Sequence, residues 1–283
     1  MSPLMTVQEL QSVLHDDNLV LLDCRFYLTD LAKGRYVFEE GHIPGAVFVD
    51  VHRQLAGVEN EHTGRHPLPE AATFAQQLKL WGIHPKSNIV VYDDMGGAIA
   101  ARAWWMLEQL GLSVKVLDGG LPAWLRAGYD TVAGASVLPS PAKVDIEVAF
   151  PWAVSESDVI QNFEMTQFCL VDARAQDRFS GENETMDPVA GHIPGAINRF
   201  FGGNMTADGV FKAPVLLAQE WQALLDGEQD IVHYCGSGVT ACHNVLALAH
   251  AGMVHNRVYV GSWSQWSKRM QRLLEQAQQD KPS

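Results

Sequence analysis

Positive charge is scarce in this chain. Its 283 residues include 20 Lys and Arg against 33 Asp and Glu, which gives a formal net charge of −13. No basic cluster stands out, and a surface of this sign repels both phosphate backbones and acidic lipid head groups. We therefore expect no binding to nucleic acid and no attachment to a membrane surface.

Long hydrophobic runs are missing as well. The apolar stretches are short and interrupted by charged residues, which excludes a membrane-spanning helix. The first residues, Met-Ser-Pro-Leu-Met-Thr, lack the basic segment and apolar run of a secretory signal. We expect a cytoplasmic protein.

Cysteine is also rare. Four cysteines in a chain of this length do not form a disulfide framework, and they lack the paired C-x-x-C spacing of a zinc site. We expect free thiols in a reducing compartment and no bound metal. The four are Cys24, Cys169, Cys235 and Cys242.

The two halves of the chain repeat one another. Four blocks recur in the same order, which indicates two copies of one fold and not a solenoid with short repeats. The paired blocks are Leu21–Arg25 with Leu170–Arg174, Gly41–Ala46 with Gly191–Ala196, Ile89–Asp93 with Ile231–Cys235, and Gly119 and Trp124 with Gly261 and Trp266.

Strands and helices alternate within each half. This order predicts an α/β fold in which a mostly parallel sheet is covered by helices on both faces. The segment 133–150 has few helix or strand signals and is interpreted as a linker between domains 1–132 and 151–283. In the first half we predict helices over 6–15, 70–81, 97–110 and from Pro122, and strands over 19–23, 88–93 and 114–117.

The stretch around Cys235 has the pattern of a strand, a loop and a helix. A β-branched and aromatic run, Ile231–Tyr234, ends at Cys235, and a helical pattern over 239–251 follows. A thiol at this place faces unpaired amide groups of the loop and the helix start, which stabilise a thiolate. Gly236 and Gly238 allow the backbone to turn these amides inward. A buried, inert cysteine is the alternative, but the context favours a reactive thiol.

The first copy lacks this thiol. Asp93 stands at the position of Cys235, and a carboxylate cannot accept a sulfur atom. The first domain is therefore expected to be catalytically inert. Because ligands of such sheets bind beyond the carboxyl ends of the strands, we expect the active cleft where the first domain covers the second.

Several other notable residues are assigned to structure. The Gly-His-Ile-Pro-Gly-Ala blocks and the Asp–Arg pairs occur in both copies, so they are expected to brace turns and strand ends. His233 is expected to be a core histidine with satisfied hydrogen bonds, and Cys242 a buried helix cysteine, with a resolving thiol as the alternative. The tryptophans expected in the core or at the domain interface are Trp104, Trp105, Trp124, Trp263 and Trp266.

The loop Cys235-Gly-Ser-Gly-Val-Thr-Ala241 resembles the active loop of the 3-mercaptopyruvate sulfurtransferases, which belong to the two-domain rhodanese-type family. In members that prefer thiosulfate, the two positions after the cysteine are usually cationic, whereas here they are Gly236 and Ser237. The resemblance implies two tandem rhodanese-like domains, of which only the second is active.

The resemblance also implies site residues. Asp50 and His66 match an aspartate and a histidine that form a relay with the loop serine, here Ser237, and Arg178 matches a substrate-binding arginine. A second family arginine is missing, since Glu182–Asp187 stands in its place, and Arg199 or Arg65 is a candidate replacement. The implied site comprises Cys235, Ser237, His66 and Asp50 for catalysis, and Arg178, Arg199, Gly236, Gly238, Val239 and Thr240 for substrate binding.

The expected reaction moves sulfur from 3-mercaptopyruvate through a Cys235 persulfide to a thiol, for example of a thioredoxin-type protein, or to cyanide, and it needs no cofactor. Thiosulfate is the alternative donor. A phosphatase or arsenate reductase requires an arginine in the loop, commonly six residues after the cysteine, where this chain has Ala241. A non-catalytic sulfur carrier, which keeps the persulfide without the relay, is the last alternative.

Overall fold

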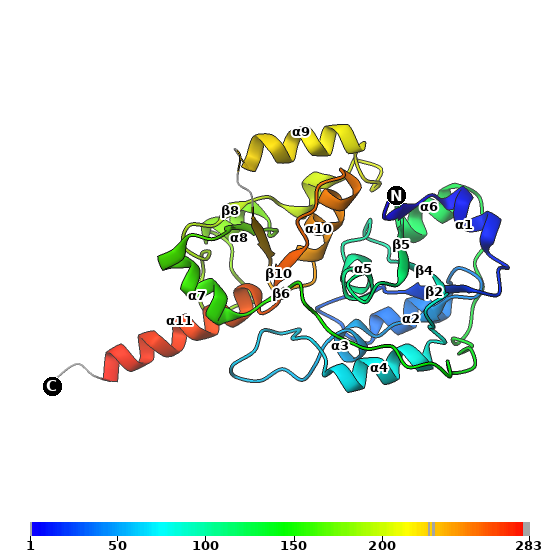
Figure 1. Ribbon diagram of the computed structural model, residues 1–283, viewed down its shortest axis with the longest axis horizontal. Coiled ribbons are helices and arrows are strands. Elements are labelled where there is room, and N and C mark those ends of the chain that lie inside the picture. The colour runs from blue at the N-terminus through cyan, green and yellow to red at the C-terminus, as the bar shows by residue number, and fades with distance from the viewer. Residues whose placement is uncertain (1, 226, 228–229, 280–283) are drawn as a thin grey trace.

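The computed structural model describes residues 2–225, 227 and 230–279. Two parallel sheets of five strands each organise the chain, in the order β1-β5-β4-β2-β3 and then β6-β10-β9-β7-β8. The two orders are equivalent, which confirms the internal repeat and the parallel α/β fold. In Figure 1 the first domain lies on the right and the second on the left.

The first domain contains the strands β1 (Leu4–Met5), β2 (Leu19–Asp23), β3 (Val47–Phe48), β4 (Asn88–Tyr92) and β5 (Ser113–Leu117). Its helices are α1 (Val7–Val13), α2 (Lys33–Glu40), α3 (Val51–Gln54), α4 (Ala71–Leu80), α5 (Ala100–Glu108) and α6 (Gly120–Arg126). Every segment predicted for this half exists. The two-residue strands β1 and β3 and the helices α2 and α3 were not predicted.

The second domain contains the strands β6 (Ala153–Val154), β7 (Cys169–Asp172), β8 (Ile197–Asn198), β9 (Ile231–Tyr234) and β10 (Arg257–Tyr259). Its helices are α7 (Glu156–Met165), α8 (Gln176–Ser180), the 3-10 helix η1 (Phe201–Asn204), α9 (Pro214–Leu225), α10 (Ala241–His250) and α11 (Ser262–Gln279). In the part of the chain that the structure describes, no helix is both long and apolar enough to cross a membrane.

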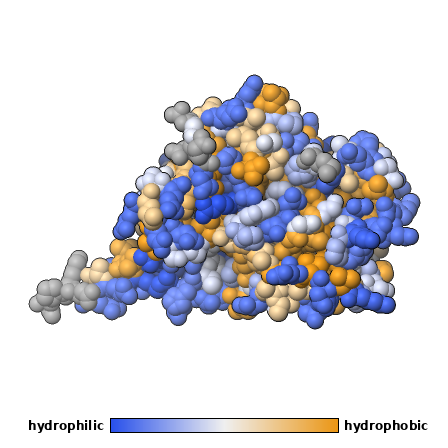
Figure 2. Space-filling view, viewed as in Figure 1, coloured by the Kyte–Doolittle hydropathy of each residue, from blue (hydrophilic) through white to orange (hydrophobic). Residues whose placement is uncertain are grey.

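The central strands are buried on both faces. Four of the five residues of β4 and all four of β9 are buried, as expected for strands between two helical layers. The side chains predicted to fill the core or the interface are buried as well, namely Trp104, Trp105, Trp124, Trp263 and Trp266. The surface is mixed, with hydrophilic groups prominent and hydrophobic ones interspersed (Figure 2).

His233 lies in the middle of β9, where its ring packs edge-on against Trp221 with 5.6 Å between centroids. Burial lowers its pKa to about 3, so the imidazole is neutral. Within the described residues neither ring nitrogen has a hydrogen-bond partner. The prediction of a core histidine is confirmed, but the prediction that its hydrogen bonds are satisfied is wrong.

The repeated turn blocks brace the strand ends as predicted. Arg25 binds the carboxylate of Asp23 and the carbonyl of Gly41, at 2.7 and 2.8 Å. Arg174 repeats these contacts in the second domain with Asp172 and with the carbonyl of Gly191, both at 2.7 Å. Each arginine thus ties the end of a central strand to the turn beside it.

The two domains pack through α5 and α10, which lie side by side at the centre of the molecule (Figure 1). The segment 133–150 contains no helix or strand and runs along α4, where the Ala142 amide donates to the Lys79 carbonyl at 3.0 Å. A single hydrophobic cluster includes buried residues of both domains. The strand ends of the second domain therefore face the first domain.

Candidate active site

Cys235 follows β9 directly and begins the loop that leads to α10. The Gly238 amide donates a hydrogen bond to its Sγ at 3.1 Å. The thiol is buried, with 1% of the residue exposed, but it lines a cavity between the domains. A sulfur that meets a loop amide beside a cavity has the environment expected of a reactive thiol.

The loop keeps this shape because Gly238 has a φ of +77°, which a residue with a side chain rarely adopts. A Cβ at this position would also lie 2.4 Å from the carbonyl oxygen of Val260. The backbone on the other side is fixed by α11, since the Trp263 amide donates to the Cys235 carbonyl at 2.9 Å. Replacing Gly238 would therefore displace the amide that points at the sulfur.

The first domain shows what the same loop does around an anion. The Asp93 carboxylate accepts hydrogen bonds from four backbone amides at 2.7–2.8 Å. These amides belong to Met95, Gly97, Ile99 and Ala100. The loop that follows the central strand is thus an anion-binding turn, which the first domain fills with its own side chain.

The cavity above Cys235 has a volume of about 430 Å³ and is walled by both domains. The second domain contributes the floor, with the sulfur loop, and the first domain contributes the cover. The residues that line it include Phe26, Arg65, His66, Arg174, Arg178, Cys235, Gly236, Ser237, Val239 and Thr240. The cleft predicted between the domains is therefore present.

Ser237 and His66 meet across this cavity. His66 Nδ1 and Ser237 Oγ are 2.9 Å apart and hydrogen-bonded, although the residues belong to different domains. Burial lowers the pKa of His66 to about 3, and the positive charges of Arg102 and Arg65 act in the same direction. The imidazole is therefore neutral at physiological pH, and it can exchange a proton with the serine hydroxyl.

Asp50 does not join this pair. Its carboxylate caps the start of α3 by accepting a hydrogen bond from the Arg53 amide, and it lies 3.7 Å from the Arg53 guanidinium. Among the described residues, no hydrogen bond or ion pair links Asp50 to His66. The side chain of α3 that contacts His66 is His52, whose ring lies edge-on at 5.6 Å. The side chain beside His66 is therefore that of His52, and not that of Asp50 as the sequence suggested.

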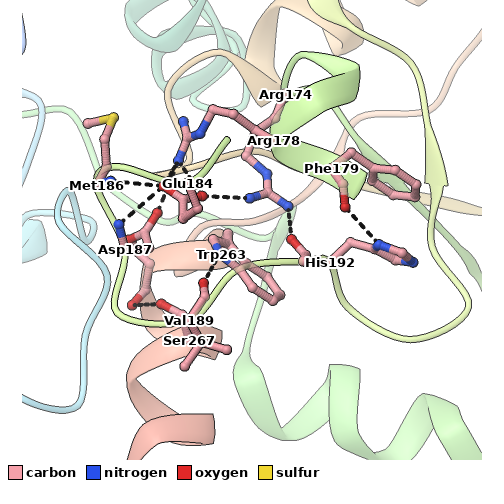
Figure 3. Close-up of polar contacts among 12 residues, drawn as sticks. Arg174, Arg178, Phe179, Glu184, Met186, Asp187, Val189, His192, Trp263 and Ser267 are labelled. Carbon is pink, nitrogen blue, oxygen red and sulfur yellow. Dashed lines mark hydrogen bonds and ion pairs between the residues drawn. The ribbon is translucent and has the colours of Figure 1, made fainter. Parts of the chain in front are cut away.

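Two arginines stand over the sulfur loop. A Cβ built on Gly236 would lie 3.2 Å from Arg65 Nη2 and 3.4 Å from Arg178 Nη1, so one nitrogen of each guanidinium faces the loop. The opposite edges hold carboxylates: Arg65 pairs with Asp187, and Arg178 pairs with Glu184 at 2.9 Å and Asp187 at 3.2 Å. The acidic segment thereby orients both arginines toward Gly236. Figure 3 shows Arg178 beside Glu184 and Asp187 of this segment.

Arg199 lies elsewhere. It pairs with Glu220 at 2.5 Å, donates to the Gly203 carbonyl at 3.0 Å, and stacks over Trp221. It does not line the cavity. Of the two replacements considered for the missing arginine, the structure brings Arg65 to the loop and holds Arg199 in the second domain's own packing.

We predict that Arg65→Gln raises KM for a carboxylate-bearing donor about 10- to 100-fold, because one charge-assisted hydrogen bond contributes about 1.5–3 kcal/mol. Arg199→Gln is the matched control, with KM expected to stay within about twofold of the parent. Steady-state kinetics on the three proteins measures this. If KM instead rose about 10- to 100-fold in the Arg199 variant and stayed at the parent value in the Arg65 variant, Arg199 would be the substrate-binding arginine, as the sequence suggested.

Cys242 sits behind the loop, not in the cavity. Its thiol donates to the Gly238 carbonyl at 3.6 Å, and burial raises its pKa to about 12. It is a free, buried helix cysteine, as predicted. A neutral thiol without access to the cavity is poorly placed to resolve a disulfide.

Most of the residues that cover the cavity could not be identified from the sequence. His52 and Phe26 contact the His66 ring, each edge-on with 5.6 Å between centroids. These residues come from turns and short helices of the first domain, where no periodic pattern indicates which side chains reach a neighbouring domain. The internal repeat was a partial signal, because it placed the first domain's loops opposite the second domain's strand ends.

Comparisons with known proteins agree with this architecture. A family model described as a rhodanese-like domain matches the chain twice, over residues 6–127 and 155–269. A probable 3-mercaptopyruvate sulfurtransferase of Pseudomonas aeruginosa is 47% identical over 268 residues, covering 93% of this chain and 94% of its own. A thiosulfate sulfurtransferase of Mus musculus is 34% identical over 259 residues, covering 89% of this chain and 86% of its own.

The solved structure of the 3-mercaptopyruvate sulfurtransferase from Leishmania major superimposes with a TM-score of 0.87 at 29% identity. The superposition covers 98% of this chain and 77% of that one. Family models match both halves, and the relatives align over nearly their whole lengths. The chain therefore belongs to the rhodanese-like sulfurtransferases and carries one such domain in each half.

Proposed function

We propose that this sulfurtransferase takes its sulfur from 3-mercaptopyruvate. The observation that supports this best is the combination, in one cavity, of the Cys235 loop, the Ser237–His66 hydrogen bond and two arginines over Gly236. The loop supplies a nucleophile and an anion-binding turn. The two arginines are suited to bind the carboxylate of the donor. The serine and histidine are suited to protonate a product that leaves as an enolate.

The first half-reaction forms a persulfide. The Cys235 thiolate attacks the donor's sulfur, an S–S bond forms, and the C–S bond breaks with its electron pair going to carbon as the enolate of pyruvate. The enolate takes up one proton and leaves as pyruvate. The amides of the loop at Gly236, Gly238, Val239 and Thr240 are proposed to hold the outer sulfur's negative charge, as the corresponding turn of the first domain holds Asp93.

The proton balance suits a neutral histidine. The donor's thiol proton is released when the persulfide ionises, and the enolate carbon consumes one, so no net proton enters the site. The Ser237 hydroxyl is proposed to deliver a proton to carbon, and His66 Nδ1 to return a proton to the serine oxygen. The proton released by the donor's thiol then returns to the other imidazole nitrogen, so the ring stays neutral. His66 therefore needs no stable charged form, which agrees with its pKa of about 3.

In the second half-reaction a thiolate attacks the outer sulfur and leaves Cys235 as a thiolate again. Small thiols, cyanide and a thioredoxin-type protein are proposed acceptors. Cys24, Cys235 and Cys242 are free thiols, which supports a reducing compartment such as the cytoplasm. Because the sulfur is carried covalently, the kinetics are expected to be ping-pong.

Charge at the cavity mouth favours a donor with one negative charge. Arg65, Arg174 and Arg178 are balanced by ion pairs with Asp172, Glu184 and Asp187. A monoanionic carboxylate needs only the free edges of two guanidinium groups. A dianion such as thiosulfate finds no excess positive charge among these side chains at the cavity to offset its desolvation.

We therefore expect kcat/KM for mercaptopyruvate to exceed that for thiosulfate by at least about tenfold, a difference of about 1.4 kcal/mol in transition-state binding. Turnover of both donors with cyanide as the acceptor, on one preparation, measures the ratio. Faster use of thiosulfate would replace the proposed donor while leaving the persulfide chemistry in place.

A further inference from the structure

A buried cation reaches the sulfur loop from the first domain. Arg102 is in α5, its residue is 0% exposed, and its Nη1 donates to the Gly238 carbonyl at 3.0 Å. Its Nη2 faces the carbonyls of Leu55 and His66 at 3.4 and 3.3 Å. The guanidinium therefore links the first domain's cover to the loop that carries Cys235.

This charge has no counter-ion in the resting structure. Over the described residues, no carboxylate forms an ion pair with Arg102, and its Nε has no hydrogen-bond partner. Its two terminal nitrogens donate to the carbonyls of Gly238, Leu55 and His66, and the Trp105 ring lies 5.7 Å from the guanidinium. A buried and unpaired charge is costly, so it persists where something compensates for it.

Two sulfur atoms are the groups that can supply a negative charge near it. The Cys242 sulfur is hydrogen-bonded to the guanidinium, and a thiolate of either Cys242 or Cys235 would attract it. Cys242 is excluded as the partner because burial raises its pKa to about 12, so it remains a thiol. Cys235 is left, and it becomes anionic as a thiolate and again as a persulfide during turnover.

We propose that Arg102 is a positioning residue that provides the counter-ion of the sulfur on Cys235 and fixes the Gly238 peptide of its loop. The inert first domain would thereby contribute the charge that the active domain lacks. The loop itself has no cationic side chain, since Gly236, Ser237, Gly238 and Val239 follow the cysteine. This inference rests on the proposed role of Cys235 as the sulfur carrier.

The test measures how alkylation of Cys235 by iodoacetamide depends on pH, followed by peptide mass. Arg102→Gln, which removes the charge, is expected to move the midpoint of the profile upward by about one pH unit or more, a tenfold loss of thiolate at a given pH below it. Arg102→Lys keeps the charge and should recover most of this shift. Arg126→Gln is the matched control, because Arg126 also donates to a carbonyl across the domains, that of Asp208 at 2.9 Å, but lies outside the cavity.

Other charges face the same sulfur and must be held constant. His66, Arg65, Arg174 and Arg178 line the cavity with Cys235, and Arg102 itself contributes to the lowered pKa of His66. The comparison is therefore repeated in a His66→Gln background, in which the same shift is expected. Alkylation needs no sulfur donor, so a failure of the proposed donor would appear in turnover and not in this experiment.

Three results would overturn the proposal. The first is a folded Arg102→Gln protein with the parent's alkylation profile, and the second is an Arg102→Lys protein shifted as far as the glutamine variant. The third concerns folding: Arg102→Met keeps the side-chain stem beside Trp105, and it should fold if the charge serves the sulfur. Loss of the folded state in both uncharged variants, measured by thermal unfolding, would make Arg102 a structural residue instead.

Discussion

Cys235→Ser is expected to abolish sulfur uptake. Incubation with mercaptopyruvate should add one sulfur atom to the intact mass of the parent and none to that of the variant, because a serine hydroxyl cannot form the persulfide. Turnover should fall by at least about 10⁴-fold, the range found when a covalent nucleophile is removed. The substitution is nearly isosteric and keeps the Gly238 amide within reach of an acceptor, so the fold should be retained.

Cys242→Ser is the matched control for this experiment. Cys242 is a buried cysteine of the same strand–loop–helix unit, seven residues further along, and it does not line the cavity. The Cys242→Ser variant should gain one sulfur atom, like the parent. Uptake of sulfur by the Cys235 variant, or its loss in the Cys242 variant alone, would move the carrier to the other thiol.

The fold could be predicted because its signals are local and occur twice. The buried strands β2, β4 and β9 are apolar runs bounded by polar turns, and both copies carry the same blocks around them. The boundary of α5 was less accurate, since the helix begins at Ala100 and not at 97. Gly96 and Gly97 have φ values of +65° and +90°, which turn the chain around Asp93 before a helix can form.

The floor of the site could also be predicted, but its cover could not. The loop from Cys235 to Thr240 is contiguous, so its residue types and spacing indicated its chemistry. Asp50 illustrates the limit. An aspartate immediately before a helix is a preferred cap, and this local hydrogen bond to the Arg53 amide fixes its carboxylate. The helix then turns the next polar side chain, His52, toward His66.

Arg65 is a site residue whose position could not be predicted from the local sequence. Its position depends on how closely two segments 199 residues apart approach, since the Arg65 amide donates to Ser264 Oγ at 3.1 Å. Gly64 permits this contact, because a Cβ there would lie 2.3 Å from the Gly261 carbonyl. A glycine next to an arginine in a loop does not by itself reveal a domain contact. Only the assembled interface distinguishes Arg65 from Arg199.

Ser237→Ala is expected to slow pyruvate release about 10²- to 10⁴-fold, the contribution typical of a positioned proton donor. His66→Gln should have a similar effect, because it removes the partner that replaces the serine's proton at 2.9 Å. The double variant should be no slower than either single one, since the two side chains act as a unit. Single-turnover measurement of pyruvate, with the protein in excess, isolates this step from sulfur transfer to the acceptor.

The pH dependence provides a second, independent test of the relay. The pKa of His66 is lowered to about 3, so protonation of this residue should inactivate the pyruvate-forming step only well below pH 5. A histidine with its ordinary pKa near 6.5 would instead cause a loss between pH 7 and 6. If that acid limb is present in the parent and disappears in His66→Gln, the neutral relay is wrong. If both single variants keep the parent's rate, Cys235 works without the relay, and the chain is better described as a sulfur carrier.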